Sequence, residues 1–515
     1  MMVPSTPAAA KFLVALALVA AASPAGAQPS DEGAAEPSDA AAPAPAPEAP
    51  EAPAETLSAP KATTKPVTPP NQSVDIAPPG AGGAAVEVPP SSWFSRQPLA
   101  LTLGEGDKQW SLTFYGFIEA NYIVDTTRSY DERIGSSLVA RDDTFDGRHG
   151  RTQFSIRNSR FGMKFQSPTS GAFRPSAVLE ADFYGPKPAE GSKTPERDYF
   201  DAAMFRIRHA YLMLESDYID VLAGQTYNVF GWQNFRSTQF RLSHSFGAAT
   251  GPVSVMLAAS AARPAQRDSS VPDGNAGLRL NVNHWRGMIT TTAASGSLSQ
   301  PMFLQVSGVG RQYKVDAFTP PPTQKANQAT AWGVSIDALV PVIPANDAGD
   351  RGNSLTLTGS FVTGTGIGDL INSNGGAEFP VLPNPAQTNP APEYEANIDR
   401  GLVSFDNRGV LHTIDWQAIK VGIQYYLPGS GRVFITANYS RAHSKNMRNL
   451  FPRGGAEIEL LGYVADETMS GDASLYWDAT PAVRFGVTGA YTKVRYLDGN
   501  EPHNLRGMAL AQYAF

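Results

Sequence analysis

Two cations share one face of a short alternating segment in the first half of the chain. Arg160 and Lys164 lie opposite to Phe161, Met163 and Phe165 in this segment. Successive side chains of a β-strand point to opposite faces, so both cations lie on the polar face of a strand whose other face is apolar. The pattern predicts water on one side of the strand and an apolar medium on the other.

Two further segments add charges of both signs to this polar face. Glu180 and Asp182 alternate with apolar residues in the first of them, and Arg206 and Arg208 do so in the second. Together with Arg160 and Lys164 they give four cations and two anions. Fixed cations between low-dielectric walls raise the local concentration of anionic solutes. Alternatively, the charges pair across neighbouring strands, which stiffens the wall and leaves little net field.

Alternation of this kind recurs from Trp110 to the end of the chain. Beyond Trp110 no stretch approaches the uninterrupted apolar length of about 20 residues that a transmembrane helix requires. Segments of roughly 9 to 16 residues suffice for tilted strands that cross a membrane as a closed barrel. We therefore predict an all-β fold, a transmembrane antiparallel β-barrel of about 16 strands. The candidate strands begin near residues 110, 152, 174, 203, 218, 252, 275, 287, 302, 329, 354, 411, 432, 468, 482 and 503.

The last strand indicates a barrel of a Gram-negative outer membrane. Leu505, Tyr513 and the terminal Phe515 share one face, whereas Arg506 and Gln512 lie on the other. A chain that stops on the aromatic residue itself resembles the barrel-assembly signal of such proteins. The alternative is an edge strand of a β-sandwich that ends in phenylalanine.

The first 100 residues differ in composition from the rest of the chain. Lys11 precedes the apolar run Phe12–Ala22 and the small residues Ala25–Ala27, which predicts a cleaved signal peptide over residues 1–27. Residues 28–100 are rich in Pro and Ala and cannot bury enough apolar surface to fold, so we predict a disordered periplasmic tail. This tail is either a spacer or a contact to the cell envelope. The barrel domain is expected over residues 105–515.

The connections between the predicted strands fall into two groups. Leu427–Gly431 and Ala479–Pro481 are tight, which is typical of periplasmic turns. Long polar connections, expected outside the cell or folded into the pore, cover residues 126–151, 226–251, 364–410 and 443–467. A barrel of this width cannot fill its interior with wall side chains, so it leaves an aqueous channel.

Two of the long connections are candidates for the narrowest part of this channel. One is the segment from Tyr227 to about Arg241, in which Arg236 and Arg241 accompany amide and aromatic groups. The other is the segment 364–410. The sequence does not decide between them. We include Arg236 and Arg241 among the predicted pore-lining residues, beside the six charged residues of the polar face.

Four sequence motifs resemble those of DcaP-like trimeric outer-membrane porins. They are Tyr115-Gly116-Phe117, Ser159-Arg160-Phe161-Gly162, Arg206-Ile207-Arg208-His209-Ala210-Tyr211 and Ala223-Gly224-Gln225-Thr226-Tyr227. The resemblance covers Trp110 to Phe515. It implies a homotrimer of 16-stranded barrels, whose basic lumen passes small and often negatively charged solutes, and it carries onto Arg160, Arg206 and Arg208. The Pro/Ala tail departs from it, because some relatives have a coiled-coil-like segment there.

These observations predict a porin for passive diffusion of small hydrophilic solutes, with a mild preference for anions such as dicarboxylates. Outer-membrane lipid is the expected surrounding, and no nucleic-acid partner, cofactor or metal is expected. The seven histidines are scattered singly, and no phosphate-binding or nucleophile-elbow motif occurs, so an enzyme is not expected. The alternative is a structural or adhesive barrel whose loops close the pore and whose tail tethers the envelope.

Overall fold

The computed structural model describes residues 99–105, 108–129, 132, 138–185, 204–232, 235–248, 251–267, 269–290, 297–316, 326–345, 351–371, 398, 401–405, 410–450 and 464–515. The predicted signal peptide and residues 28–98 of the predicted tail lie outside this set. Helices in the described part are short, namely α2 (Phe145–Arg148), α4 (Gly368–Ile371) and α5 (Met447–Leu450). None of the helices described is long and apolar enough to cross a membrane.

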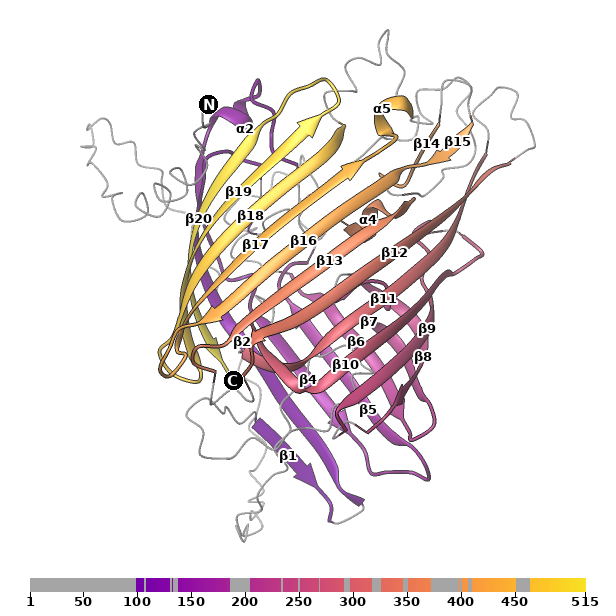
Figure 1. Cartoon of the computed structure of the whole chain (residues 1–515), viewed down its shortest axis with the longest axis vertical. Helices are drawn as coiled ribbons and strands as arrows, with labels where there is room; N and C mark the ends of the chain where they lie inside the picture. Colours follow the sequence, from indigo (N-terminus) through magenta and orange to yellow (C-terminus); the bar gives the residue numbers. More distant parts are fainter. Residues whose placement is uncertain are drawn as a thin grey trace, which may run out of the picture.

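The strands form a closed antiparallel barrel (Figure 1). Of the 18 strands in the sheet, β1 and β3 do not occupy a full wall position of their own, which leaves the predicted 16. Each wall strand pairs with the next along the chain, and β20 returns to pair with β2. The wall strands are β2 (Trp110–Asp125), β4 (Arg160–Gln166), β5 (Arg174–Asp182), β6 (Arg206–Glu215), β7 (Asp220–Tyr227), β8 (Arg236–Phe246), β9 (Val253–Ala262), β10 (Asp273–Thr290), β11 (Ser297–Asp316), β12 (Ala326–Ile343), β13 (Leu355–Thr365), β16 (Asp415–Tyr426), β17 (Val433–Ser444), β18 (Ala465–Asp478), β19 (Val483–Tyr496) and β20 (His503–Ala514).

The two additional strands both pair with β2. β3 (Arg151–Ser155) pairs with its second half and β4 with its first half, so β3 and β4 share one position in the wall. β1 (Leu99–Leu103) pairs with the segment Trp110–Phe114, beside the point where β20 ends. The sequence analysis did not predict β1, which projects with the start of β2 at the bottom of Figure 1.

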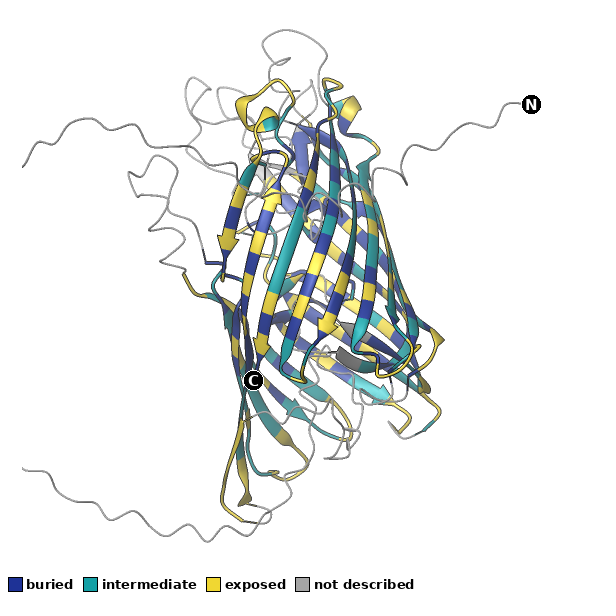
Figure 2. Ribbon diagram, turned by 90° about the vertical axis from the view of Figure 1, so that its left-hand side faces the viewer, coloured by how far each residue is buried: buried dark blue, intermediate teal, exposed yellow. Residues whose placement is uncertain are grey.

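Side chains alternate between the two faces of the wall, as predicted. Along β2, Ile118 is 60% exposed on the outside, whereas Glu119 and Asp125 are buried on the inside. Along β20, Tyr513 is exposed and Arg506 is buried. Figure 2 shows this alternation of buried and exposed residues along the strands. An apolar exterior and a polar interior are what a barrel needs to cross a bilayer around water.

The predicted number of strands is correct, but two of the predicted positions are wrong. β8 occupies Arg236–Phe246, inside the predicted loop 226–251. The strands predicted to begin at 275 and 287 are a single strand, β10, with a register shift between Val282 and Arg286. The signal for β8 is present, because Phe240 and Leu242 alternate with polar residues that line the interior. The two errors cancel in the count.

The two ends of the barrel differ in the length of their connections. The turn between β16 and β17 uses Gly429 at φ +92° and Gly431 at φ +62°, a backbone region that disfavours other residues. It lies at the same end as the terminal Phe515, whose backbone hydrogen-bonds to Gly116 of β2 at 3.0 and 3.1 Å. The opposite end carries α4, α5 and the hairpin of β14 (Val403–Phe405) and β15 (Leu411–Thr413) (Figure 1).

Candidate pore constriction

Strands β4, β5 and β6 bring charged residues of the polar face together. The register places Arg160 of β4 opposite Asp182 of β5, and Asp182 opposite Arg206 of β6. A register shift follows in β6, where Glu180 is paired with His209, so that one extra residue, Arg208, is accommodated. Such a bulge re-aims side chains. Here Arg208 and His209 are consecutive and both are buried on the inside of the barrel.

Ion pairs connect these residues into one arginine–carboxylate cluster, made of Arg160, Glu180, Asp182, Arg206 and Arg208. Arg206 donates through Nε and Nη2 to the two oxygens of Asp182, at 3.0 and 2.6 Å. Arg208 donates to Glu180 at 2.7 Å and to Asp182 at 2.9 Å. Arg160 Nε lies 3.3 Å from Glu180 Oε1. The cluster therefore holds three guanidinium groups and two carboxylates, an excess of one positive charge.

The members of the arginine–carboxylate cluster differ in their access to solvent. Both carboxylate side chains are fully buried, and the side chains of Arg160 and Arg208 are 3% and 8% exposed. The Arg206 side chain is 28% exposed. Arg206 donates from Nε and Nη2 to Asp182, and its Cζ lies 5.3 Å from the centroid of the Tyr184 ring. It is therefore the arginine of the cluster that a solute in the lumen meets.

The other three predicted pore-lining residues lie at different places. Arg236, the first residue of β8, is half-buried opposite Tyr227, and the charges of Arg206 and Arg208 act on it. Lys164 lies four positions from Arg160 along β4, which corresponds to about 13 Å of extended strand. Arg241 is buried in β8. It donates to the side chain of Gln239 and to the carbonyl of Tyr227.

Arg236 is thus near the cluster, whereas Lys164 and Arg241 lie apart from it.

The connection that follows β7 folds into the barrel. Gly231 donates its backbone N–H to Ser307 Oγ at 2.9 Å and accepts from Gln305 Nε2 at 3.1 Å. The ring of Trp232 packs edge-on against Phe303, with 5.2 Å between centroids. All three wall residues belong to β11. The predicted inward loop is therefore confirmed at Gly231 and Trp232, whereas the part of the predicted segment from Arg236 to Arg241 belongs to the wall strand β8.

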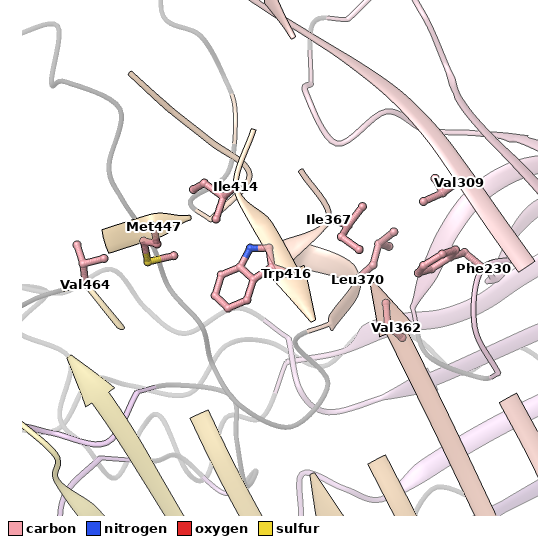
Figure 3. Packing of buried hydrophobic residues seen from close by; sticks show 9 residues of the cluster. All are labelled: Phe230, Val309, Val362, Ile367, Leu370, Ile414, Trp416, Met447 and Val464. Carbon is pink, nitrogen blue, oxygen red and sulfur yellow. The ribbon is translucent and has the colours of Figure 1, made fainter. Parts of the chain in front are cut away.

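The connection that follows β13 folds inward as well. Ile367 and Leu370 are buried in a hydrophobic cluster that also contains Phe230 from the first loop. Figure 3 shows these residues in a row that continues through Trp416 and Met447 toward Val464. The two segments predicted as alternative candidates for the constriction thus pack together on the inner side of the wall.

The inward face of β16 around Lys420 differs from the part of the wall that the hydrophobic cluster contacts. Lys420 lies between Ser360 and Ser440 of the neighbouring strands, on the face opposite to Ile419 and Val421. Its side chain is nevertheless exposed to solvent. An inward lysine that reaches solvent is expected where the lumen contains water.

Sequence reasoning did not identify Arg311, Asp273 and Asp369, which form a second group of ion pairs inside the barrel. Arg311 Nε lies 2.8 Å from Asp273, and its Nη1 lies 2.6 Å from Asp369. The alternation that contains Arg311 has Val309 and Tyr313 on the same inward face, so the polar face is not evident there. Among the described residues, no group of three or more His, Asp or Glu side chains could hold a metal ion.

No family model matches the sequence, and no curated protein matches it. Among solved structures, the outer membrane channel DcaP of Acinetobacter baumannii superposes with a TM-score of 0.53 at 15% identity, over 79% of this chain and 97% of that chain. The anion-selective porin from Comamonas acidovorans gives a TM-score of 0.43 at 9% identity, over 79% and 100%. Salmonella typhi OmpF in complex with daunomycin gives 0.43 at 9% identity, over 81% and 100%.

The chain has the fold of the outer-membrane porins. Within that class, the superposition on DcaP confirms the DcaP-like fold that the sequence motifs indicated.

Proposed function

We propose that this protein is an outer-membrane porin through which small hydrophilic solutes diffuse passively, with a mild preference for anions such as dicarboxylates. The observation that carries the proposal is the excess guanidinium of the arginine–carboxylate cluster at the lumen wall. A closed wall of this size leaves an aqueous interior. The inward loops narrow that interior, and the solvent-exposed Lys420 supports the presence of water in it.

The preference for anions follows from the unequal pairing within the cluster. Asp182 accepts hydrogen bonds from two arginines, and Glu180 accepts from Arg208 and from Tyr115 at 3.1 Å. The carboxylates are therefore saturated and fully buried, while Arg206 is partly exposed. A carboxylate in the lumen can approach Arg206 without competing with an exposed acidic group of the cluster. Low-dielectric walls strengthen this attraction.

The apolar exterior supports outer-membrane lipid as the surrounding. The homotrimer remains a prediction from the sequence resemblance, and the cleaved signal peptide remains a prediction from the N-terminal sequence pattern. A barrel closed by its own loops is the second candidate, because the hydrophobic cluster of Figure 3 joins residues of both inward loops to Val309 of β11, Val362 of β13 and Trp416 of β16.

Recording from planar lipid bilayers in a salt gradient tests the proposal. The porin predicts stepwise ohmic conductance, in triplets if the protein is a trimer, and a reversal potential that favours chloride over potassium. A reversal potential that favours potassium would contradict the anion preference. Absence of conductance from folded protein would favour the loop-closed barrel.

A further inference from the structure

The first residues of the loop that follows β13 make polar contacts to the wall. Asp369 of α4 accepts from Arg311 Nη1 at 2.6 Å and from Nη2 at 2.9 Å. The carbonyl of Gly366 accepts from Tyr313 Oη at 2.8 Å and from Arg311 Nη1 at 3.3 Å. Two residues on the same face of β11, Arg311 and Tyr313, thus hold Gly366 and Asp369 of the inward segment 366–371.

The same arginine is also bound to the wall. Its Nε lies 2.8 Å from Asp273, at the start of β10, and its side chain is 2% exposed. Arg311 therefore connects a carboxylate of the wall with a carboxylate of the loop. Because both acidic partners are present, loss of either one leaves the buried guanidinium with the other.

The chain leaves the wall at a glycine, Gly366, whose backbone conformation disfavours other residues. Gly366 has φ +65°, and a Cβ on this residue would lie 2.6 Å from the Cβ of Ala331 and 2.9 Å from the ring of Tyr313. From there the loop places Ile367 and Leu370 in the hydrophobic cluster with Phe230. The position of the loop that follows β7 consequently depends on the position of the loop that follows β13.

We propose that Arg311 is a positioning residue for the constriction: through Asp369 it holds the segment 366–371 against β11, and through that segment it sets the width of the pore. This inference rests on the proposed function, since a width matters only if solutes pass. Arg311 lies outside the arginine–carboxylate cluster, so its effect is on the size of solutes and not on the sign of their charge.

The two carboxylates provide a matched pair of variants. Asp369→Asn removes the charge that holds the loop and leaves Arg311 paired with Asp273. Asp273→Asn removes a charge of the wall and leaves the link between Arg311 and the loop. Both keep the side-chain volume, and both leave Arg311 one carboxylate partner. Leu370→Ala is a second way to release the loop, without any change of charge.

Hydrogen exchange measures the link directly, without need of conductance. The amides of Gly366 and Leu370 donate to Ile414 and Ile367 at 2.8 and 2.9 Å. Loss of the bidentate carboxylate–guanidinium pair in Asp369→Asn should speed their exchange by about tenfold or more. Leu370→Ala should act in the same direction, and Asp273→Asn should stay near the parent protein. Equal exchange in the two Asn variants would overturn the proposal.

Bilayer recording and liposome swelling with sugars of increasing size then measure the width. We expect Asp369→Asn to raise single-channel conductance by about twofold, with added noise, and to admit larger sugars, whereas Asp273→Asn keeps the parent values. A released loop with unchanged conductance and size limit would overturn the role in pore width. A parent protein that does not conduct would contradict the proposed function, and the exchange comparison would still decide whether Arg311 holds the loop.

Discussion

Two groups of buried arginines inside the barrel have opposite charge balance and different surroundings. The arginine–carboxylate cluster of β4, β5 and β6 has three guanidinium groups for two carboxylates, and Arg206 remains partly exposed to the lumen. The group around Arg311 has one guanidinium for two carboxylates, one of which belongs to a loop. The first group presents an excess charge to the lumen, whereas the second joins a loop to the wall.

The comparison shows that inward position alone does not assign a role to a charged residue in a wide barrel. Charges that pair fully inside a low-dielectric wall contribute little external field. What distinguishes the two groups is the number of partners for each arginine and the exposure that remains after pairing. Variants of single residues can separate these roles.

The largest effect is expected from removing a carboxylate of the arginine–carboxylate cluster. Glu180→Gln leaves Arg160 and Arg208, both buried, without the charge that they share, which should lower the free energy of unfolding by about 3–5 kcal/mol. Urea titration of the protein in detergent or lipid measures the loss. Asp143→Asn is the control, because its carboxylate is exposed in a loop, and it should leave the midpoint unchanged. Equal stability of both variants would show that the cluster is not structural.

A smaller effect on stability, but a clear effect on conductance, is expected at the contact between the loops. Phe230→Ala removes a fully buried ring from the hydrophobic cluster and should loosen both inward loops. Single-channel conductance should rise, while the reversal potential stays the same because no charge changes. Phe240→Ala on the outer face of β8 is the control and should conduct like the parent protein. An unchanged conductance in Phe230→Ala would remove these loops from the constriction.

Selectivity should respond most to the exposed arginine of the cluster. Arg206→Gln removes the excess cation, so the reversal potential in a salt gradient should move toward the value for a non-selective pore. Its partner Asp182 still accepts from Arg208 at 2.9 Å, and folding should be retained. The double variant Arg206→Glu/Arg208→Glu is less informative, because the carboxylate at position 208 would face the buried carboxylates of Glu180 and Asp182. A reversal potential that does not move would reject Arg206 as the source of selectivity.

The smallest effect on selectivity is expected at Lys420, on the inward face of β16. Lys420→Gln removes an exposed charge from the inward face of β16, so stability should not change measurably. The reversal potential should shift in the same direction as for Arg206→Gln, by less, because the charges of Asp472 and Asp337 act on Lys420 and offset its field. A larger shift than for Arg206→Gln would show that Lys420 contributes more to the electrostatic field in the lumen than Arg206 does.

The wall of the barrel could be predicted from the sequence because its signal is local. Alternation with a period of two assigns Glu119 and Arg506 to the inside and Ile118 and Tyr513 to the outside without knowledge of any neighbour. The same signal is weak where inward residues are apolar, as around Arg311, or where a strand is interrupted, as in β10. The prediction failed or was silent at these places, and it also missed β8, although the alternation of β8 is present in the sequence.

The sequence by itself thus determined the fold class and, for most wall strands, which face is polar, because adjacent residues of a strand point to opposite faces. Tertiary structure decided which of those charges neutralise one another. The link from Arg311 to Asp369 joins residues 58 positions apart, and the hydrophobic cluster that contains Phe230 and Ile367 joins two separate loops. Such pairs follow from strand register and from loops that fold back into the barrel, neither of which is encoded within a single strand.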